Sequence, residues 1–130
     1  MNNNQRRYYI IGSVLILTGI ILGAFGAHAL KQLLIDFSEK IVSFETGVRY
    51  QIYAGFSFLF LGLIESKFNV KLIANFWLIG TIFFSLSIYL LALNPLLGDS
   101  FSFLGPITPI GGLLLIVGWL ILVLKLIKLK

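Results

Sequence analysis

The side chains that could do chemistry are few and lie in two short stretches of the chain. His28 is the only histidine, and Glu45 and Arg49 follow it, with Tyr50 and Gln51 directly after the arginine. Glu45 and Arg49 are four residues apart, one helical turn, so their charged ends can pair. We therefore treat His28, Glu45, Arg49, Tyr50 and Gln51 as a candidate polar site.

Two interpretations of this polar site stay open. In one, His28 handles a proton or contacts a ligand, and the Glu45–Arg49 region lines a binding pocket. In the other, the histidine is simply favoured by the dipole at a helix C-terminus, and Arg49 is a structural clamp that ties its helix to nearby loop carbonyls. A clamp can also form the wall of a pocket.

Several reactive centres are excluded by residue type. The chain has no cysteine and one histidine, so it offers no disulfide, no thiolate metal site and no cysteine nucleophile, and cannot assemble the usual zinc site. No set of nucleophile, base and orienting group surrounds the histidine. We expect no enzymatic activity, no catalytic residue, no metal and no cofactor.

Composition places most of the chain in lipid. Of 130 residues, 58% are hydrophobic and only 12% are charged, and the mean hydropathy is +1.00. A soluble domain of this size cannot bury so much apolar surface. The net charge of +5 then reflects membrane topology rather than nucleic-acid binding, because basic residues collect on the cytoplasmic side.

Uncharged stretches predict an all-α, integral membrane four-helix bundle in a single domain, residues 1–130. A helix needs roughly 20 residues to cross a hydrocarbon core of about 30 Å. Ser38 is expected to cap the second helix, and Thr108, followed by Pro109, the fourth. The expected helices span about 8–30, 39–64, 72–93 and 109–124.

The second of these helices has an unusually short uncharged part. Arg49 and Glu65 are separated by 15 residues, which make a helix of roughly 22 Å. Because this is shorter than the hydrocarbon core, at least one charged end must lie at membrane depth or snorkel to the interface.

Small residues at regular spacing mark the faces where helices are expected to pack closely. Within one chain this packing joins neighbouring helices, and homodimerisation is the less favoured use of the same faces. The expected packing residues are Gly19, Gly23 and Ala27 in the first helix, Gly55 and Gly62 in the second, and Gly111, Gly112 and Gly118 in the fourth.

The distribution of basic residues predicts the orientation. One side of the membrane would hold seven Lys and Arg residues, namely Arg6, Arg7, Lys67, Lys71, Lys125, Lys128 and Lys130, and the other only three, namely Lys31, Lys40 and Arg49. The positive-inside rule therefore places both termini in the cytoplasm. The basic C-terminal tail is expected to meet anionic lipid headgroups.

Three sequence blocks resemble the signature of a known family. They are Gly23-Ala-Phe-Gly-Ala-His-Ala-Leu30, Thr46-Gly-Val-Arg-Tyr-Gln51, and Thr108-Pro-Ile-Gly-Gly112 followed by Gly118-Trp119. In this order they are similar to domain of unknown function 423, a family of small bacterial membrane proteins with relatives among small animal transmembrane proteins. The resemblance implies a four-helix protein of the bacterial cytoplasmic membrane and no established activity.

Two departures from the family pattern bear on function. The family usually has a histidine where this chain has Ala54, and a glycine where it has Leu86. If the missing histidine shared a chemistry with the one that matches His28, this chain should lack that chemistry. If the protein instead tolerates Ala54 in place of the histidine, this favours a structural role for the polar site.

We therefore expect a structural or accessory component of the membrane, acting alone, as a homo-oligomer or within a larger complex, with membrane lipids as partners. The alternative is a carrier or binding protein for a small apolar or amphipathic molecule, such as a lipid or quinone. Its polar site would lie near the outer leaflet, at the five residues named first.

Overall fold

The computed structural model describes residues 1–129, and within them the chain folds into helices joined by loops. The longest connection, between Ala92 and Ile107, contains the 3₁₀ turns η3 (Asn94–Leu96) and η4 (Ser102–Leu104). Lys130, one of the basic residues counted for orientation, lies outside the described residues. Four continuous helical rods are long and apolar enough to cross a membrane, which confirms the all-helical, four-span prediction. The rods are α1 (Asn3–Phe25) with the π-helical turn η1 (Gly26–Leu30) and α2 (Lys31–Leu33); α3 (Ser38–Ile64); α4 (Lys71–Thr81) with the π-helical turn η2 (Ile82–Leu86) and α5 (Ser87–Ala92); and α6 (Ile107–Lys128).

The start of α1 differs from the prediction because of a capping box. The Asn2 side chain accepts a hydrogen bond from the Gln5 amide at 2.8 Å, and the Gln5 side chain accepts one from the Asn2 amide at 2.9 Å. Both bonds satisfy amides that a helix start leaves unpaired. The helix therefore begins at Asn3, five residues before the apolar run.

The caps of α3 and α6 also differ from the predictions. Phe37, not Ser38, is the N-cap of α3 and makes no side-chain capping bond. Pro106 is the N-cap of α6, so this helix begins at Ile107 and continues to Lys128. Pro109 falls in its first turn, where a missing N–H costs no helical bond. The 27 residues of α3 extend about 40 Å, so its first turns lie beyond a hydrocarbon core of about 30 Å.

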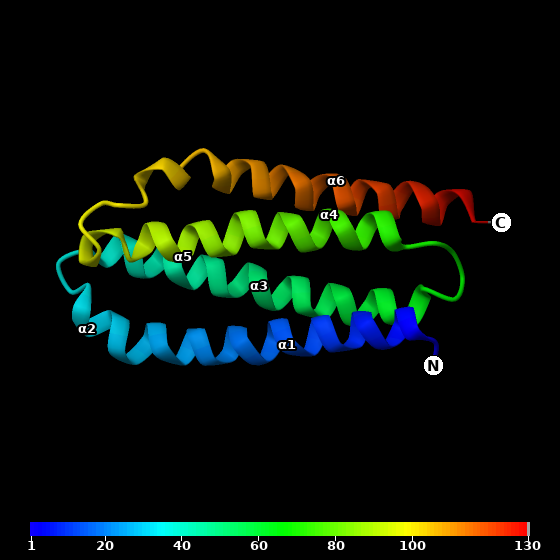
Figure 1. Cartoon of the computed structure of the whole chain (residues 1–130), viewed down its shortest axis with the longest axis horizontal. Coiled ribbons are helices and arrows are strands. Elements are labelled where there is room, and N and C mark those ends of the chain that lie inside the picture. Colours follow the sequence, from blue (N-terminus) through cyan, green and yellow to red (C-terminus); the bar gives the residue numbers. More distant parts are fainter. Residues whose placement is uncertain (130) are drawn as a thin grey trace.

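The four rods lie side by side in the order of the sequence. Figure 1 shows α1 and α6 at opposite edges, with α3 and the α4–α5 rod between them. The extensive contacts join α1 to α3, α3 to α5 and η2, and α4 to α6. The N-terminus, the α3–α4 loop and the end of α6 lie together at one end of the molecule (Figure 1). We call this the terminal end.

Glycines bring α1 and α3 into backbone contact. A Cβ atom added at Gly55 would lie 2.5 Å from Ile16 and 2.9 Å from the Gly12 carbonyl oxygen. One added at Gly19 would lie 2.7 Å from Ile52. Gly23 and Gly62 lie in the same contact, the first against Val48 at 3.3 Å and the second against Tyr9 at 2.5 Å.

Ala27 does not continue this packed face, although its spacing predicted that it would. It is exposed, and Gly26 is buried in its place, with an added Cβ 2.9 Å from Phe44. Successive residues of an α-helix are about 100° apart, so each step of four residues rotates the side-chain direction about the helix axis by about 40°. Ala27, two steps from Gly19, has therefore rotated off the contact, whereas Gly26 is one heptad from Gly19 and stays near it.

A second glycine contact joins α6 to the α4–α5 rod. A Cβ at Gly111 would lie 2.7 Å from the backbone carbon of Phe83, and one at Gly118 would lie 2.5 Å from Trp77. Gly112 is beside this contact, because a Cβ there meets only the Phe84 ring at 3.5 Å. The helix faces that carry glycines thus pack against other helices of the same chain, and the outward faces of α1 and α6 carry apolar side chains.

Candidate functional site

The structure does not gather the five residues of the predicted polar site. His28 lies in η1 and is exposed, as are Glu45 and Arg49 on α3. Within residues 1–129 no ion pair within 4.0 Å joins Glu45 to Arg49. Tyr50 is 42% exposed, whereas Gln51 is only 7% exposed. These two neighbours therefore belong to two different environments, a surface groove and the interior.

Arg49 lies beside the uncharged part of α1. A Cβ added at Gly23 of α1 would lie 3.3 Å from the preceding residue, Val48, and Gly23 lies eight residues before Lys31, or about 12 Å along the helix. Between Tyr8 and Leu30 the first rod has no Lys, Arg, Asp or Glu. The guanidinium therefore leaves the protein surface beside a stretch without charged residues, which agrees with the prediction that it lies at membrane depth or snorkels to the interface.

Gln51 is the centre of a buried hydrogen-bond network that joins three helices. Its Nε2 donates to the Leu15 carbonyl at 3.0 Å and to the Thr18 hydroxyl at 2.8 Å, both on α1. Its Oε1 accepts from the Tyr89 hydroxyl of α5 at 2.7 Å. Both the NH₂ group and the carbonyl oxygen of the Gln51 side chain are thus hydrogen-bonded, which fixes α1 and α5 against α3. The sequence singled out Gln51, but it contained no signal that would find its partners.

Serine hydroxyls add two further links between helices. Ser85 in η2 donates to the carbonyl of Gly47 on α3 at 2.8 Å. The hydroxyls of Ser87 and Thr108 lie 2.7 Å apart and join α5 to α6. Thr108 therefore connects two helices instead of capping α6.

A groove opens on the membrane-facing surface between α3 and α6, over the α4–α5 rod. Its volume is about 620 Å³. We call it the aromatic groove, because five of its lining residues carry aromatic rings. Its lining comprises Tyr50, Tyr53, Ala54 and Ser57 of α3, Trp77 and Phe84 of the α4–α5 rod, and Gly112, Leu115, Ile116 and Trp119 of α6.

The rings of the aromatic groove form two groups. Tyr50 lies against Phe84 with ring centroids 4.8 Å apart and against Tyr53 at 5.7 Å, and Trp77 lies against Trp119 at 4.5 Å. Trp77 is almost completely buried, whereas 47% of Trp119 is exposed. The absent side chain of Gly112 leaves room beside Phe84. The groove can therefore accept a chain or a flat ring through apolar contact.

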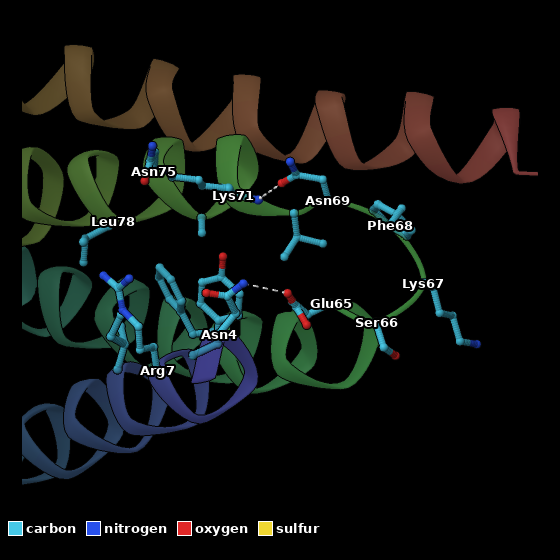
Figure 2. Close-up of a pocket in the computed structure, with 15 residues that line it drawn as sticks. Asn4, Arg7, Glu65, Ser66, Lys67, Phe68, Asn69, Lys71, Asn75 and Leu78 are labelled. Carbon is cyan, nitrogen blue, oxygen red and sulfur yellow. Dashed lines mark hydrogen bonds between the residues drawn. The ribbon is translucent and has the colours of Figure 1, made fainter. Parts of the chain in front are cut away.

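A second cavity, of about 580 Å³, lies at the terminal end (Figure 2). We call it the end cavity. Its lining includes the α3–α4 loop and the polar groups of Asn4, Arg7, Lys71 and Asn75. The apolar part of the lining is formed by Tyr8, Ile11, Phe58, Ala74 and Leu78.

Among residues 1–129, Glu65 is the only carboxylate in the lining of the end cavity, and it is already paired with amides. One of its oxygens accepts from the Asn2 side chain at 2.7 Å, and the other accepts from Asn4 at 3.0 Å. These two bonds favour the charged form and hold the pKa of Glu65 below its usual value. The carboxylate thus attaches the start of α1 to the end of α3.

Comparison with known proteins places the chain among bacterial membrane proteins. The sequence profile of a family described as "Protein of unknown function (DUF423)" matches residues 22–112. The chain belongs to this family. A UPF0382 membrane protein of Staphylococcus haemolyticus is 39% identical over 127 residues, which cover 95% of this chain and 98% of that protein. The UPF0382 membrane protein YwdK of Bacillus subtilis is 30% identical over 125 residues, covering 93% and 96%. No solved structure matches the chain.

The two departures from the family pattern fall in different surroundings. Ala54, where a histidine was expected, is buried and lines the aromatic groove. Leu86, where a glycine was expected, is 50% exposed at the end of η2. A change at Ala54 therefore alters the groove wall, whereas Leu86 only adds apolar surface.

Proposed function

We propose that this member of the DUF423 family binds a membrane-dissolved amphipathic molecule, such as a lipid or quinone, in the aromatic groove. The observation that supports this is the groove itself. Glycines close the contacts of α1 with α3 and of α6 with the α4–α5 rod, but over that rod, between α3 and α6, a space of about 620 Å³ remains open. Ligand sites of roughly 300–1,000 Å³ with mostly apolar walls are typical of small-molecule binding.

The polar part of such a molecule would lie beside Arg49. This residue precedes Tyr53 by four positions and therefore shares its face of α3. Tyr53 lines the groove, so the guanidinium lies one helical turn beyond it, toward the start of α3. A chain or ring in the groove would leave its polar group within reach of that charge. Arg49 would then have a binding role without an ion pair to Glu45.

We propose binding without catalysis. Ser57, the serine in the groove lining, donates its hydroxyl to the Tyr53 carbonyl. Two buried hydroxyls are also committed to helix contacts: Ser85 donates to Gly47 and Tyr89 donates to Gln51. The single histidine is exposed in η1 and is not the acceptor of either hydroxyl. These contacts support a scaffold that holds a molecule and does not transform it.

A structural or accessory role in a homo-oligomer or larger membrane complex is the second candidate. It is favoured by the outward faces of the edge helices, since only 17% of the spanning residues are buried in the first and the fourth rods, against 56% in α3. Native mass measurement after mild detergent extraction tests this role. A strictly monomeric particle without a bound protein would contradict it.

The two tryptophans of the chain both line the aromatic groove and report on its occupancy. In a Trp119→Phe variant, Trp77 is the only tryptophan and can be excited selectively over the tyrosines; it is 1% exposed, so lipid outside the groove cannot contact it. We would titrate phosphatidylcholine with brominated acyl chains into the detergent-solubilised protein. We expect saturable quenching of Trp77 at a low mole fraction of brominated lipid.

Matched serine variants identify the place of binding. Ser57 and Ser43 both lie on α3 and donate to the carbonyl four residues earlier, but only Ser57 lines the groove. Ser57→Phe should fill the groove and reduce the quenching by more than half, whereas Ser43→Phe should leave it unchanged. Absent quenching, or equal quenching in both variants, would refute the proposal.

We also propose that the protein lies in the cytoplasmic membrane with both termini inside. The grouping of the N-terminus, the α3–α4 loop and the end of α6 at one end (Figure 1) and the basic residues there support this orientation. Because the chain has no cysteine, single cysteines can be labelled cleanly. An impermeant maleimide should label Ser100→Cys on intact cells and Ser66→Cys only after permeabilisation. The reverse pattern would contradict the orientation.

A further inference from the structure

We propose that the end cavity binds the phosphate headgroup of an anionic glycerophospholipid. This site lies at the terminal end, between α1 and α4, and is separate from the aromatic groove between α3 and α6. Its occupant is distinguished by negative charge, whereas the groove selects for an apolar chain or ring. The two sites can therefore be tested independently.

Charge is the first reason for this assignment. The cations Arg7 and Lys71 come from different helices, α1 and α4, and line the same cavity. In Figure 2 the Arg7 side chain rises from α1 toward α4, whereas Lys67 points outward from the loop. A guanidinium and an ammonium on two walls are groups that bind a phosphate, the first through paired hydrogen bonds.

The state of Glu65 is the second reason. Within the part of the chain that the structure describes, it is the only carboxylate that lines the cavity, and its two oxygens accept hydrogen bonds from the Asn2 and Asn4 amides. Within residues 1–129 neither Arg7 nor Lys71 forms an ion pair within 4.0 Å with it. Among the described residues, the lining thus carries three cations, Lys67 included, against one carboxylate, and an anionic ligand would balance the remaining positive charge.

The apolar part of the cavity favours a lipid over a free anion. Tyr8 and Ile11 open the uncharged run of α1, and together with Phe58 and Leu78 they line the side of the cavity that leads into the spanning region. A phospholipid would place its phosphate between the cations and an acyl chain over these residues. A free phosphate would leave the apolar wall in contact with water, which is unfavourable.

Lipid competition on the full-length protein tests this assignment. Native mass spectrometry would compare bound phosphatidylglycerol with bound phosphatidylcholine, with glycerol 3-phosphate as the free-anion probe. We expect a clear preference for phosphatidylglycerol. Arg7→Gln or Lys71→Gln should each lower that preference about fivefold, the usual effect of one basic residue on anionic lipid.

Arg6 provides the matched control, because it is exposed next to Arg7 but does not line the cavity. Arg6→Gln removes the same charge and should change the preference by less than about twofold. Equal losses for Arg6→Gln and Arg7→Gln would show general surface attraction and overturn the proposal. Equal binding of the two phospholipids, or displacement of phosphatidylglycerol by glycerol 3-phosphate, would overturn it as well. If Arg7→Gln disturbs the fold, Lys71→Gln provides the test.

Discussion

Replacing Gly111 with alanine should force α6 away from η2, whereas the same change at Gly112 should be tolerated. A Cβ at Gly111 would lie 2.7 Å from the backbone carbon of Phe83 and 2.8 Å from the Cα of Phe84. Carbon atoms in favourable contact are about 3.5–4.0 Å apart. Because backbone atoms cannot rotate aside as a side chain does, the helices must separate by about 1 Å.

The adjacent glycine makes the effect measurable. At Gly112 the nearest atom to an added Cβ is a ring carbon of Phe84 at 3.5 Å, an ordinary contact. Alanine is favoured over glycine inside a helix by about 1 kcal/mol at both positions. Overpacking against backbone costs about 3 kcal/mol, the upper part of the usual range. Gly111→Ala should therefore lose about 2 kcal/mol of stability, and Gly112→Ala should gain up to about 1 kcal/mol.

Reversible unfolding in mixed micelles, in which a denaturing detergent is titrated into a mild one, measures this difference. Tryptophan fluorescence is a direct signal, since Trp77 also contacts α6 at Gly118. The two variants should differ by about 3 kcal/mol, more than a hundredfold in the unfolding equilibrium constant. If both unfold at the same detergent fraction, the backbone contact between α6 and η2 is not formed as described.

Three further predictions follow from other contacts. Gln51→Leu should lower stability by about 2 kcal/mol, because three hydrogen bonds are lost at about 0.6–1 kcal/mol each. Adding Tyr89→Phe to this variant should lower stability by less than Tyr89→Phe does in the unaltered protein, because the Tyr89 hydroxyl has already lost its acceptor. Gly26→Ala should reduce the midpoint of thermal unfolding, because its Cβ meets a buried ring at 2.9 Å, whereas Ala27→Val at the exposed neighbour should leave it unchanged. The lowered pKa of Glu65 means that its stabilising contact is complete above its usual value of 4.5 and is lost as the pH falls through the lowered value. The protection of the amides in the first turn of α1 against hydrogen exchange, relative to their intrinsic rates at each pH, should therefore fall in acid, and Glu65→Gln should abolish that fall.

The number of spans could be predicted because it depends on length alone. A helix has a fixed rise per residue and the apolar band has a fixed thickness. The short uncharged stretch after Arg49 predicts by the same reasoning that this residue lies inside the band. Its pairing with Glu45 could not be predicted in the same way, because residues one turn apart can meet but exposed side chains gain little by doing so.

The sequence also could not show which residues would line the candidate sites. The wall of the aromatic groove combines Tyr50, Trp77 and Trp119 from three different rods. Periodicity gives the face of each helix but not the rotation of one helix against another. The same limit explains Gly112 and Ala27, whose spacing suggested packing although one lies beside the glycine contact and the other is exposed.

By itself the sequence determined that the chain spans a membrane four times, because apolar runs of this length are stable as helices in a lipid bilayer and not in water. It also determined which reactive centres are excluded, since residue types alone exclude them. Only the tertiary structure decided that Gln51 is buried while Tyr50 faces a groove, and that Glu65 is bound by asparagine amides instead of by the nearby cations. Those outcomes depend on which helix faces meet at backbone distance, and that is settled by packing between residues far apart in the chain.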